Sequence, residues 1–159
     1  VVKAPESIAL ELAIKKSIKH TAMMMVKAPG PIIGVSGILL LARSIRKWPI
    51  KYDQKKAARY LGSVIRMQEE IGTGGAGFRF LYAAFLQESS KLLNAPILQE
   101  ISNQMTEVGD LWRKFAIDSG RVVKNRPQNG ESYDSVADQL VIISGLEKAI
   151  FTQLYKLKL

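Results

Sequence analysis

Apolar side chains recur every three or four residues along nearly the whole chain, and this helical period constrains the fold more than any other feature. In residues 5–27 the apolar stripe includes Ile14, Ile18 and Ala22, and the intervening lysines face outward. The one β-like run, LVIIS at residues 140–144, lies inside a longer helical pattern. We therefore expect an all-α fold.

Start and stop signals divide the chain into six helices with short connections. Pro5 and Ser7 suit the start of the first helix, Ser36 and Asp53 are expected N-caps, and the second helix should stop before Pro49. The expected helices cover residues 5–27, 35–48, 53–71, 76–93, 94–120 and 135–159, with a polar loop at 121–134. The predicted architecture is a single-domain bundle of about six helices over residues 1–159, with a glycine-rich inter-helix loop.

The loop sequence GTGGAGFRF, residues 72–80, contains Gly72, Gly74 and Gly77 in a G-x-G-x-x-G pattern. A dinucleotide-binding fingerprint needs a strand before the glycines and a βαβ unit around them, whereas helical sequence stands on both sides here. A phosphate-binding P-loop needs Lys and Ser or Thr where this chain has Phe78 and Arg79. The sequence therefore excludes both kinds of nucleotide site.

Two functions remain open for the loop. Its glycines permit positive φ, its N–H groups lie at a helix N-terminus that attracts anions, and Arg79 adds a planar donor fork. Alternatively, the loop is a tight joint between packed helices, and the aromatic side chains beyond it belong to the core. The candidate ligand- or anion-binding residues are Gly72, Thr73, Gly74, Gly75, Gly77, Phe78, Arg79 and Tyr82.

Side chains for catalysis or metal binding are scarce. The chain has no cysteine, and His20 is its one histidine, so we expect no metal site and no cofactor. Ser36 in GVSGI misses the G-x-S-x-G pattern by one residue and precedes a helix. Glu69 and Glu70 are adjacent and diverge around their helix, so they do not form an inward carboxylate pair. We expect no catalytic residue in this chain.

Positive charge is concentrated near the N-terminus. The formal net charge is +9, and residues 1–66 carry 13 Lys and Arg against three acids. Such a surface favours an anionic partner, although a solvated helix face would have the same composition. The candidate partner-binding residues are Arg43, Arg46, Lys47, Lys51, Lys55, Lys56 and Arg59.

The setting of the chain follows from what its sequence lacks. No apolar stretch of about 18 residues is present, so we expect no membrane-spanning helix. The absence of cysteine and of a signal-peptide layout favours a cytoplasmic location. Because the sequence starts with Val1 instead of Met, we expect a domain of a longer protein.

The segment GTGGAGFRFLYAAFLQESSKLL, residues 72–93, resembles the glycine-rich signature of the helical domain of unknown function found in butirosin biosynthesis protein H and its relatives. The flanks SIALELAIKKSIKHTAMMM, GVSGILLLARSIRKWP and ILQEISNQMTEVGDLWRKFA also resemble that domain, and the likeness spans most of residues 6–118. The resemblance implies the C-terminal half of a two-domain protein. It also implies a companion N-terminal domain, similar to cysteine peptidases, that supplies the nucleophile for an acyltransferase or a peptidase-like activity.

The same resemblance implies a partner for the basic residues. The named family member transfers an acyl group from an acyl carrier protein, and such carriers are acidic. We therefore expect this chain to dock an acyl donor, or to form one wall of the companion domain's active site. Two alternatives stay open: a nucleic-acid-binding helical domain, against which the lack of a helix-turn-helix pattern counts, and a structural or homo-oligomerising domain without a ligand.

Overall fold

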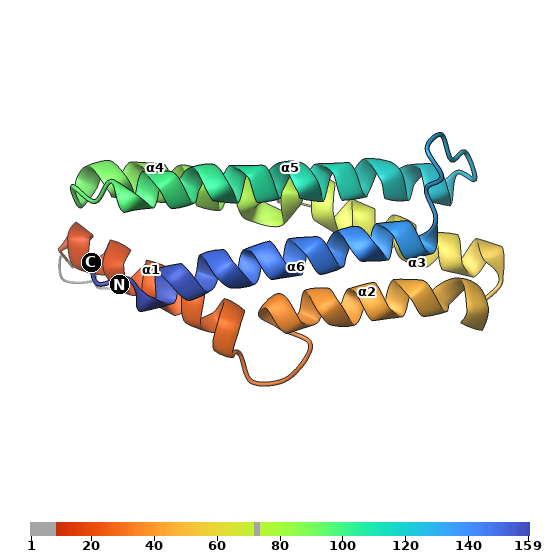
Figure 1. The fold of residues 1–159 in the computed structure, drawn as a ribbon, viewed down its shortest axis with the longest axis horizontal. Coiled ribbons are helices and arrows are strands. Elements are labelled where there is room, and N and C mark those ends of the chain that lie inside the picture. Colours follow the sequence, from red (N-terminus) through yellow and green to blue (C-terminus); the bar gives the residue numbers. More distant parts are fainter. Residues whose placement is uncertain (1–8, 72–73) are drawn as a thin grey trace, which may run out of the picture.

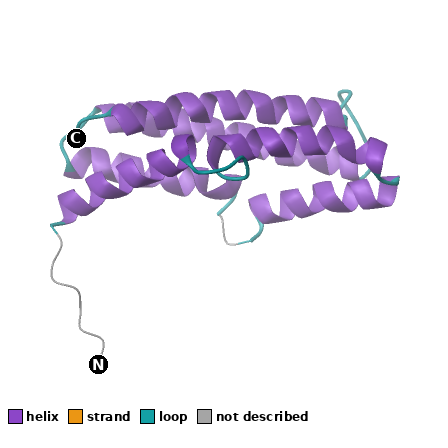
Figure 2. Ribbon diagram, turned by 90° about the horizontal axis from the view of Figure 1, so that it is seen from below, coloured by secondary structure: helices purple, strands orange, loops and turns teal. Residues whose placement is uncertain are grey.

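The computed structural model describes residues 9–71 and 74–159 and confirms the all-α prediction. These residues form six α-helices and one short 3₁₀ helix, with no strand among them (Figures 1 and 2). The elements are α1 (Leu10–Lys27), α2 (Gly34–Lys51), α3 (Gln54–Glu69), η1 (Ala76–Phe78), α4 (Arg79–Leu92), α5 (Ile97–Val123) and α6 (Tyr133–Lys156).

The last helix is the centre of the bundle. In Figure 1, α6 lies between α5 and α2, and α1 packs against its C-terminal half. The helices α4 and α5 form an antiparallel hairpin, and α3 contacts α5. The short helix η1, which lies between α3 and α4 in the chain, also contacts α5.

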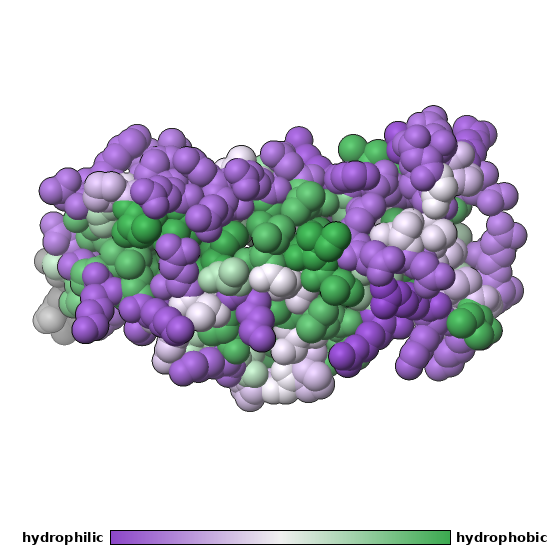
Figure 3. All heavy atoms as spheres, in the orientation of Figure 1, coloured by the Kyte–Doolittle hydropathy of each residue, from purple (hydrophilic) through white to green (hydrophobic). Residues whose placement is uncertain are grey.

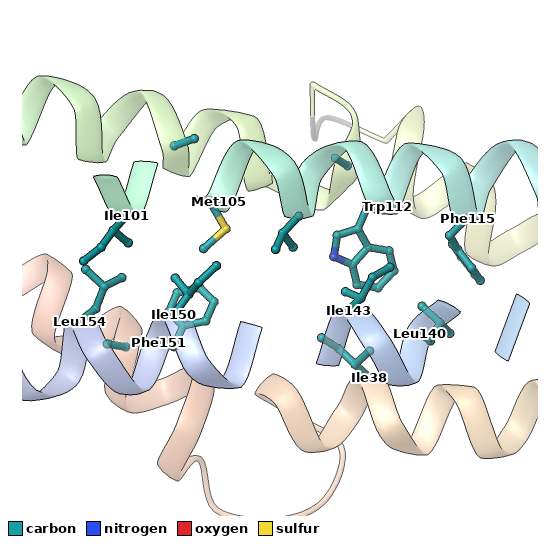
Figure 4. Packing of buried hydrophobic residues seen from close by; sticks show 14 of the residues in the cluster. Ile38, Ile101, Met105, Trp112, Phe115, Leu140, Ile143, Ile150, Phe151 and Leu154 are labelled. Atoms are coloured by element: carbon teal, nitrogen blue, oxygen red, sulfur yellow. The ribbon is translucent and has the colours of Figure 1, made fainter. Parts of the chain in front are cut away.

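The core follows the helical periods of α5 and α6. Figure 4 shows the two helices facing each other in layers, with Ile101 near Leu154 and Phe115 near Leu140. The rings of Trp112 and Phe115 meet edge to face, 5.7 Å between centroids. Side chains one helical turn apart fill these layers, so packing confirms the apolar stripe that the sequence predicts.

The helix ends confirm one of the predicted start and stop signals and contradict three. Asp53 caps α3, since its side chain accepts a hydrogen bond from the Lys56 N–H at 2.9 Å. The predicted cap Ser36 is wrong: α2 begins at Gly34, where a Cβ would lie 2.4 Å from the Met25 carbonyl oxygen. This close backbone contact with the end of α1 fixes the start of α2.

The predicted stop before Pro49 is also wrong, because α2 continues to Lys51. Proline removes one N–H from the last turn, which still closes through a bond from the Tyr52 N–H to the Trp48 carbonyl at 2.9 Å. The last helix begins two residues before the predicted start, at a capping box formed by Ser132 and Ser135. Pro5 and Ser7, the predicted start of the first helix, lie outside the described residues.

No helix in the described part of the chain is both long enough and apolar enough to cross a membrane.

Candidate functional site

The glycine-rich loop has a left-handed backbone. Gly74, Gly75, Ala76, Gly77 and Phe78 all have positive φ, between 50° and 85°. The two non-glycine residues in this run are each disfavoured by about 1–2 kcal/mol in such a conformation, so the surrounding contacts must hold the loop in place. The candidate residues Gly72 and Thr73 lie outside the described residues.

A carboxylate of the chain itself binds a loop N–H. Glu69, at the end of α3, accepts a hydrogen bond from the Ala76 N–H at 3.1 Å. A Cβ added to Gly75 would lie 3.1 Å from the other oxygen of the same carboxylate. A carboxylate of the chain thus occupies a loop N–H that the anion-binding alternative would offer to a ligand. The neighbouring Glu70 points elsewhere and pairs with Arg66, as the divergence of adjacent residues predicts.

The guanidinium of Arg79 is also bound internally. Its Nε and Nη2 donate to the two carboxylate oxygens of Glu147, at 2.8 and 2.9 Å, and its Nη1 donates to the Gly77 carbonyl at 2.7 Å. Trp112 Nε1 donates to the same carboxylate at 2.7 Å. The Glu147 side chain is fully buried, whereas Arg79 is 20% exposed. One residue from each of α4, α5 and α6 thus meets in a buried polar cluster.

A small hollow lies beside this cluster. It measures about 170 Å³ and is lined by Thr21, Met25, Gly77, Phe78, Arg79, Tyr82, Met105 and Phe151. The volume is below the range of about 300–1,000 Å³ that is usual for ligand pockets. The hollow is therefore too small for a nucleotide.

Tyr82 contributes an unusual hydroxyl to the hollow. Its ring stacks at tilted angles on Phe85 and Phe151, 5.8 and 5.7 Å between centroids. Its buried hydroxyl has no hydrogen-bond partner among the described residues, and burial raises the pKa of the phenol above its ordinary value. Phe78, by contrast, is 54% exposed and does not join the core. The loop geometry favours the interpretation as a helix joint, while ligand binding at these residues stays a prediction.

The basic residues of α2 and α3 separate into two groups. Arg46 pairs with Asp138 and lies 3.9 Å from Asp134, so its charge is used to hold α2 against α6. The other candidates are exposed side chains that pair with no carboxylate in the described part of the chain: Arg43, Lys47, Lys51, Lys55, Lys56 and Arg59. These charges are available to a partner.

Three aromatic rings meet among these cations. The Tyr60 ring lies 5.6 Å from Trp48 and 5.2 Å from Tyr52, between centroids. The ammonium groups of Lys51 and Lys56 lie over the Tyr52 ring, at 5.5 and 4.7 Å from its centroid. In the sequence Trp48 is an isolated aromatic, and the turn between α2 and α3 brings Tyr60 against both Trp48 and Tyr52.

We call this region the basic corner, defined by Trp48, Tyr52 and Tyr60 with Lys47, Lys51, Lys55, Lys56 and Arg59. A surface hollow of about 400 Å³ opens on it, lined by Asp53, Lys55, Lys56, Arg59 and Tyr60. The corner combines exposed positive charge with apolar ring surface, and these two properties together suit an anionic partner that also carries an apolar group.

Sequence reasoning missed one further polar cluster. Asp118, on α5, is buried and accepts hydrogen bonds from Lys114, Arg121 and Gln139. Arg121 also donates to Glu131 at 2.6 Å. This cluster ties the polar loop after α5 to the bundle. Among the described residues no three potential ligands come together as a metal site.

Comparison with known proteins gives one match. A family model described as Domain of unknown function (DUF4872) matches residues 1–154. No curated protein and no solved structure matches the chain.

Proposed function

The chain belongs to the family Domain of unknown function (DUF4872), and for this member we propose the role of an accessory helical domain that docks an acidic acyl donor at the basic corner. The donor is an acyl carrier protein, and the chemistry belongs to a companion N-terminal domain of the butirosin biosynthesis protein H type. In this proposal the bundle positions the donor and forms one wall of the companion's active site.

The charge of the basic corner supports this proposal. Lys47, Lys55 and Arg59 are exposed and form no ion pair with another described residue, so a partner can bind them without breaking such a pair. An acidic carrier surface is complementary to these residues, and the concentrated charge would accelerate the encounter. That these cations have no ion-pair partner in residues 9–71 and 74–159 is the single observation that carries the proposal.

The ring cluster supports the same role. The Trp48, Tyr52 and Tyr60 rings offer apolar area beside the cations, and the adjacent hollow of about 400 Å³ has room for part of a pantetheine arm. Carrier proteins present their acyl group on such an arm. The corner is thus suited to the protein surface and to the arm that projects from it.

Fluorescence anisotropy with a labelled holo acyl carrier protein tests the proposal. The variant Lys47→Glu and the pair Lys55→Glu with Arg59→Glu should each weaken binding about tenfold or more at low salt. Lys15→Glu with Lys16→Glu, on α1, is the matched control and should leave the affinity unchanged. Arg46→Glu is a poor test, because it breaks the contact with Asp138. Equal affinities for all variants would refute docking at this corner.

One observation favours a second candidate. Many proteins that bind single-stranded nucleic acid also use aromatic rings set among lysines. A labelled 20-nucleotide single strand in the same assay separates the two functions. Tight binding to the strand, lost on Tyr60→Ala and absent for the carrier, would assign the corner to nucleic acid.

A further inference from the structure

A continuous apolar strip runs along the outer face of α6. Val141, Ile142 and Leu146 are 43%, 59% and 42% exposed. Gly145 and Ala149 are also exposed and lie on the same face. Figure 3 shows apolar surface over the left and central parts of the molecule in this view, with polar groups above and below it. Three large apolar side chains exposed within two helical turns form a patch, and patches of this kind mark interaction surfaces.

Hollows lie on both sides of the strip. One of about 460 Å³ separates α6 from α5 and is lined mainly by apolar groups, among them Val108, Leu111 and Ile150. The other, of about 270 Å³, lies between α6 and α2 and is bordered by Val35 and Leu39. The ridge of α6 and its two flanking hollows provide the knobs and holes that helix packing requires.

The middle of the strip permits a close helix crossing. A Cβ placed on Gly145 would meet no atom within 4 Å, so this backbone is open to an approaching helix. Ala149, one turn later, adds only a methyl group. Small side chains at this point let a second backbone approach, while Ile142 and Leu146 supply the apolar contact around it.

The charges at the two ends of α6 show which partner fits. Asp134 lies at its N-terminal end and Lys156 at its C-terminal end, each eleven residues from Gly145. Eleven residues are close to three helical turns, so both charges lie on nearly the same face as Gly145. The Asp134 side chain is 80% exposed; Arg46 lies 3.9 Å from it but pairs more closely with Asp138. The exposed Lys148 borders the centre on the side of α2. The face therefore has an acidic end, a mainly apolar centre and a basic end.

We propose that this face binds a second copy of the chain, with the two α6 helices antiparallel and crossing at Gly145. Antiparallel pairing places Asp134 of each copy beside Lys156 of the other, and Val141 beside Ala149. Parallel pairing would instead place like charges together. The interface is isologous, so one surface serves both copies.

The crossing angle decides whether the charges meet. With a rise of about 1.5 Å per residue, each charged end lies about 16 Å from the crossing point. At the shallow angle of about 20° that is usual in bundles, the helix axes diverge by only about 6 Å more at that distance, within reach of a lysine. At about 50° they would diverge by roughly twice as much, and the ion pairs would not form.

This inference uses a different surface from the proposed function. The basic corner lies on α2 and α3, so dimerisation and carrier binding can be tested independently. Each copy carries a formal charge of +9, which opposes association at low salt. The dimer should therefore persist or tighten when salt is raised, because apolar contact holds it together.

Sedimentation equilibrium of the 159-residue chain, at 150 and 500 mM salt, tests the dimer. We expect a dimer at micromolar concentrations, and Ala149→Glu should weaken it at least about a hundredfold by placing a charge in the apolar centre. Leu92→Glu, an exposed apolar residue on α4, is the matched control and should have no effect. A chain that stays monomeric at 100 μM would overturn the proposal.

A charge exchange tests the antiparallel arrangement. Asp134→Lys and Lys156→Asp should each weaken the dimer about tenfold, since each variant turns two symmetric attractions into repulsions. The double variant restores opposite charges and should recover most of the affinity. Circular dichroism confirms that each variant is folded. A double variant weaker than either single one would refute this pairing.

Discussion

Replacing Arg79 by methionine should destabilise the bundle far more than replacing Glu147 by glutamine. In Arg79→Met the fully buried carboxylate keeps the Trp112 N–H as its one donor among the described residues. Removing one partner of a buried ion pair costs about 3–5 kcal/mol, because the remaining charge is left without compensation. Domains of this kind are stable by only about 5–15 kcal/mol, so the loss would be a large part of the total.

Replacing the other partner, in Glu147→Gln, should cost less stability. In Glu147→Gln the amide oxygen still accepts from Trp112, and the guanidinium of Arg79, 20% exposed, can reach water. We therefore expect a cost of about 1–3 kcal/mol. The double variant places a neutral amide beside an apolar side chain and should cost less than Arg79→Met alone. The coupling energy of the cycle should then be about 2 kcal/mol or more.

Urea unfolding followed by circular dichroism at 222 nm measures all four free energies of unfolding. The slope of the free energy against urea should stay constant across the cycle, which shows that the same surface is exposed in each case. Equal losses for the two single variants, or additive losses in the double variant, would refute the assignment of Arg79 as the compensating charge for Glu147.

Three further outcomes are expected. Tyr82→Phe should raise the free energy of unfolding by about 1 kcal/mol, because it removes a buried hydroxyl that has no partner in the described part of the chain. A variant that melted at a lower temperature than the natural chain would contradict this. Gly77→Ala should cost more than the control Gly130→Ala: both residues have positive φ, but only at Gly77 would the added Cβ lie 2.9 Å from the Arg79 and Gln68 side chains. Equal losses in urea unfolding would show that those side chains move aside. The pKa of Glu131 is lowered from 4.5 to about 2, mainly by the hydrogen bond from the Asn129 N–H. The stabilising contribution of the Glu131 carboxylate is therefore complete above pH 4.5 and is lost as the pH falls towards 2. In Glu131→Gln the free energy of unfolding should lack this part of the pH dependence. The same slope of free energy against pH in the variant and the natural chain, between pH 4.5 and 2, would contradict the prediction.

Sequence periodicity predicted the fold class, because an apolar stripe must be buried wherever its helix packs. Asp53 could be identified as a cap from its neighbours alone, since a cap bonds within three residues. Local sequence signals predicted a helix end wrongly where contact with a distant part of the backbone determines it. The start of α2 is set by the Met25 carbonyl, which no pattern around Ser36 reveals.

The candidate site was predicted only in part, because its contacts join residues far apart in the sequence. Glu147 lies 68 residues from Arg79, in a stretch whose charges resemble those of a solvated helix face. The internal pairing of Arg46 and the meeting of Trp48 with Tyr60 also depend on the folded arrangement. Composition could identify a basic segment, but it could not show which cations stay free.

The buried carboxylate on α6 has a consequence for how the helices find their alignment. If α6 slid by one turn, about 5.4 Å, along α5, Glu147 would leave its three donors and face apolar side chains. Apolar layers alone tolerate such slippage, since one Leu or Ile replaces another at nearly the same height. We expect hydrogen exchange in the Arg79→Met, Glu147→Met double variant to show weaker protection along α6 than in the natural chain. The ion pair would then select one alignment of α6 along α5 from several that bury similar apolar area.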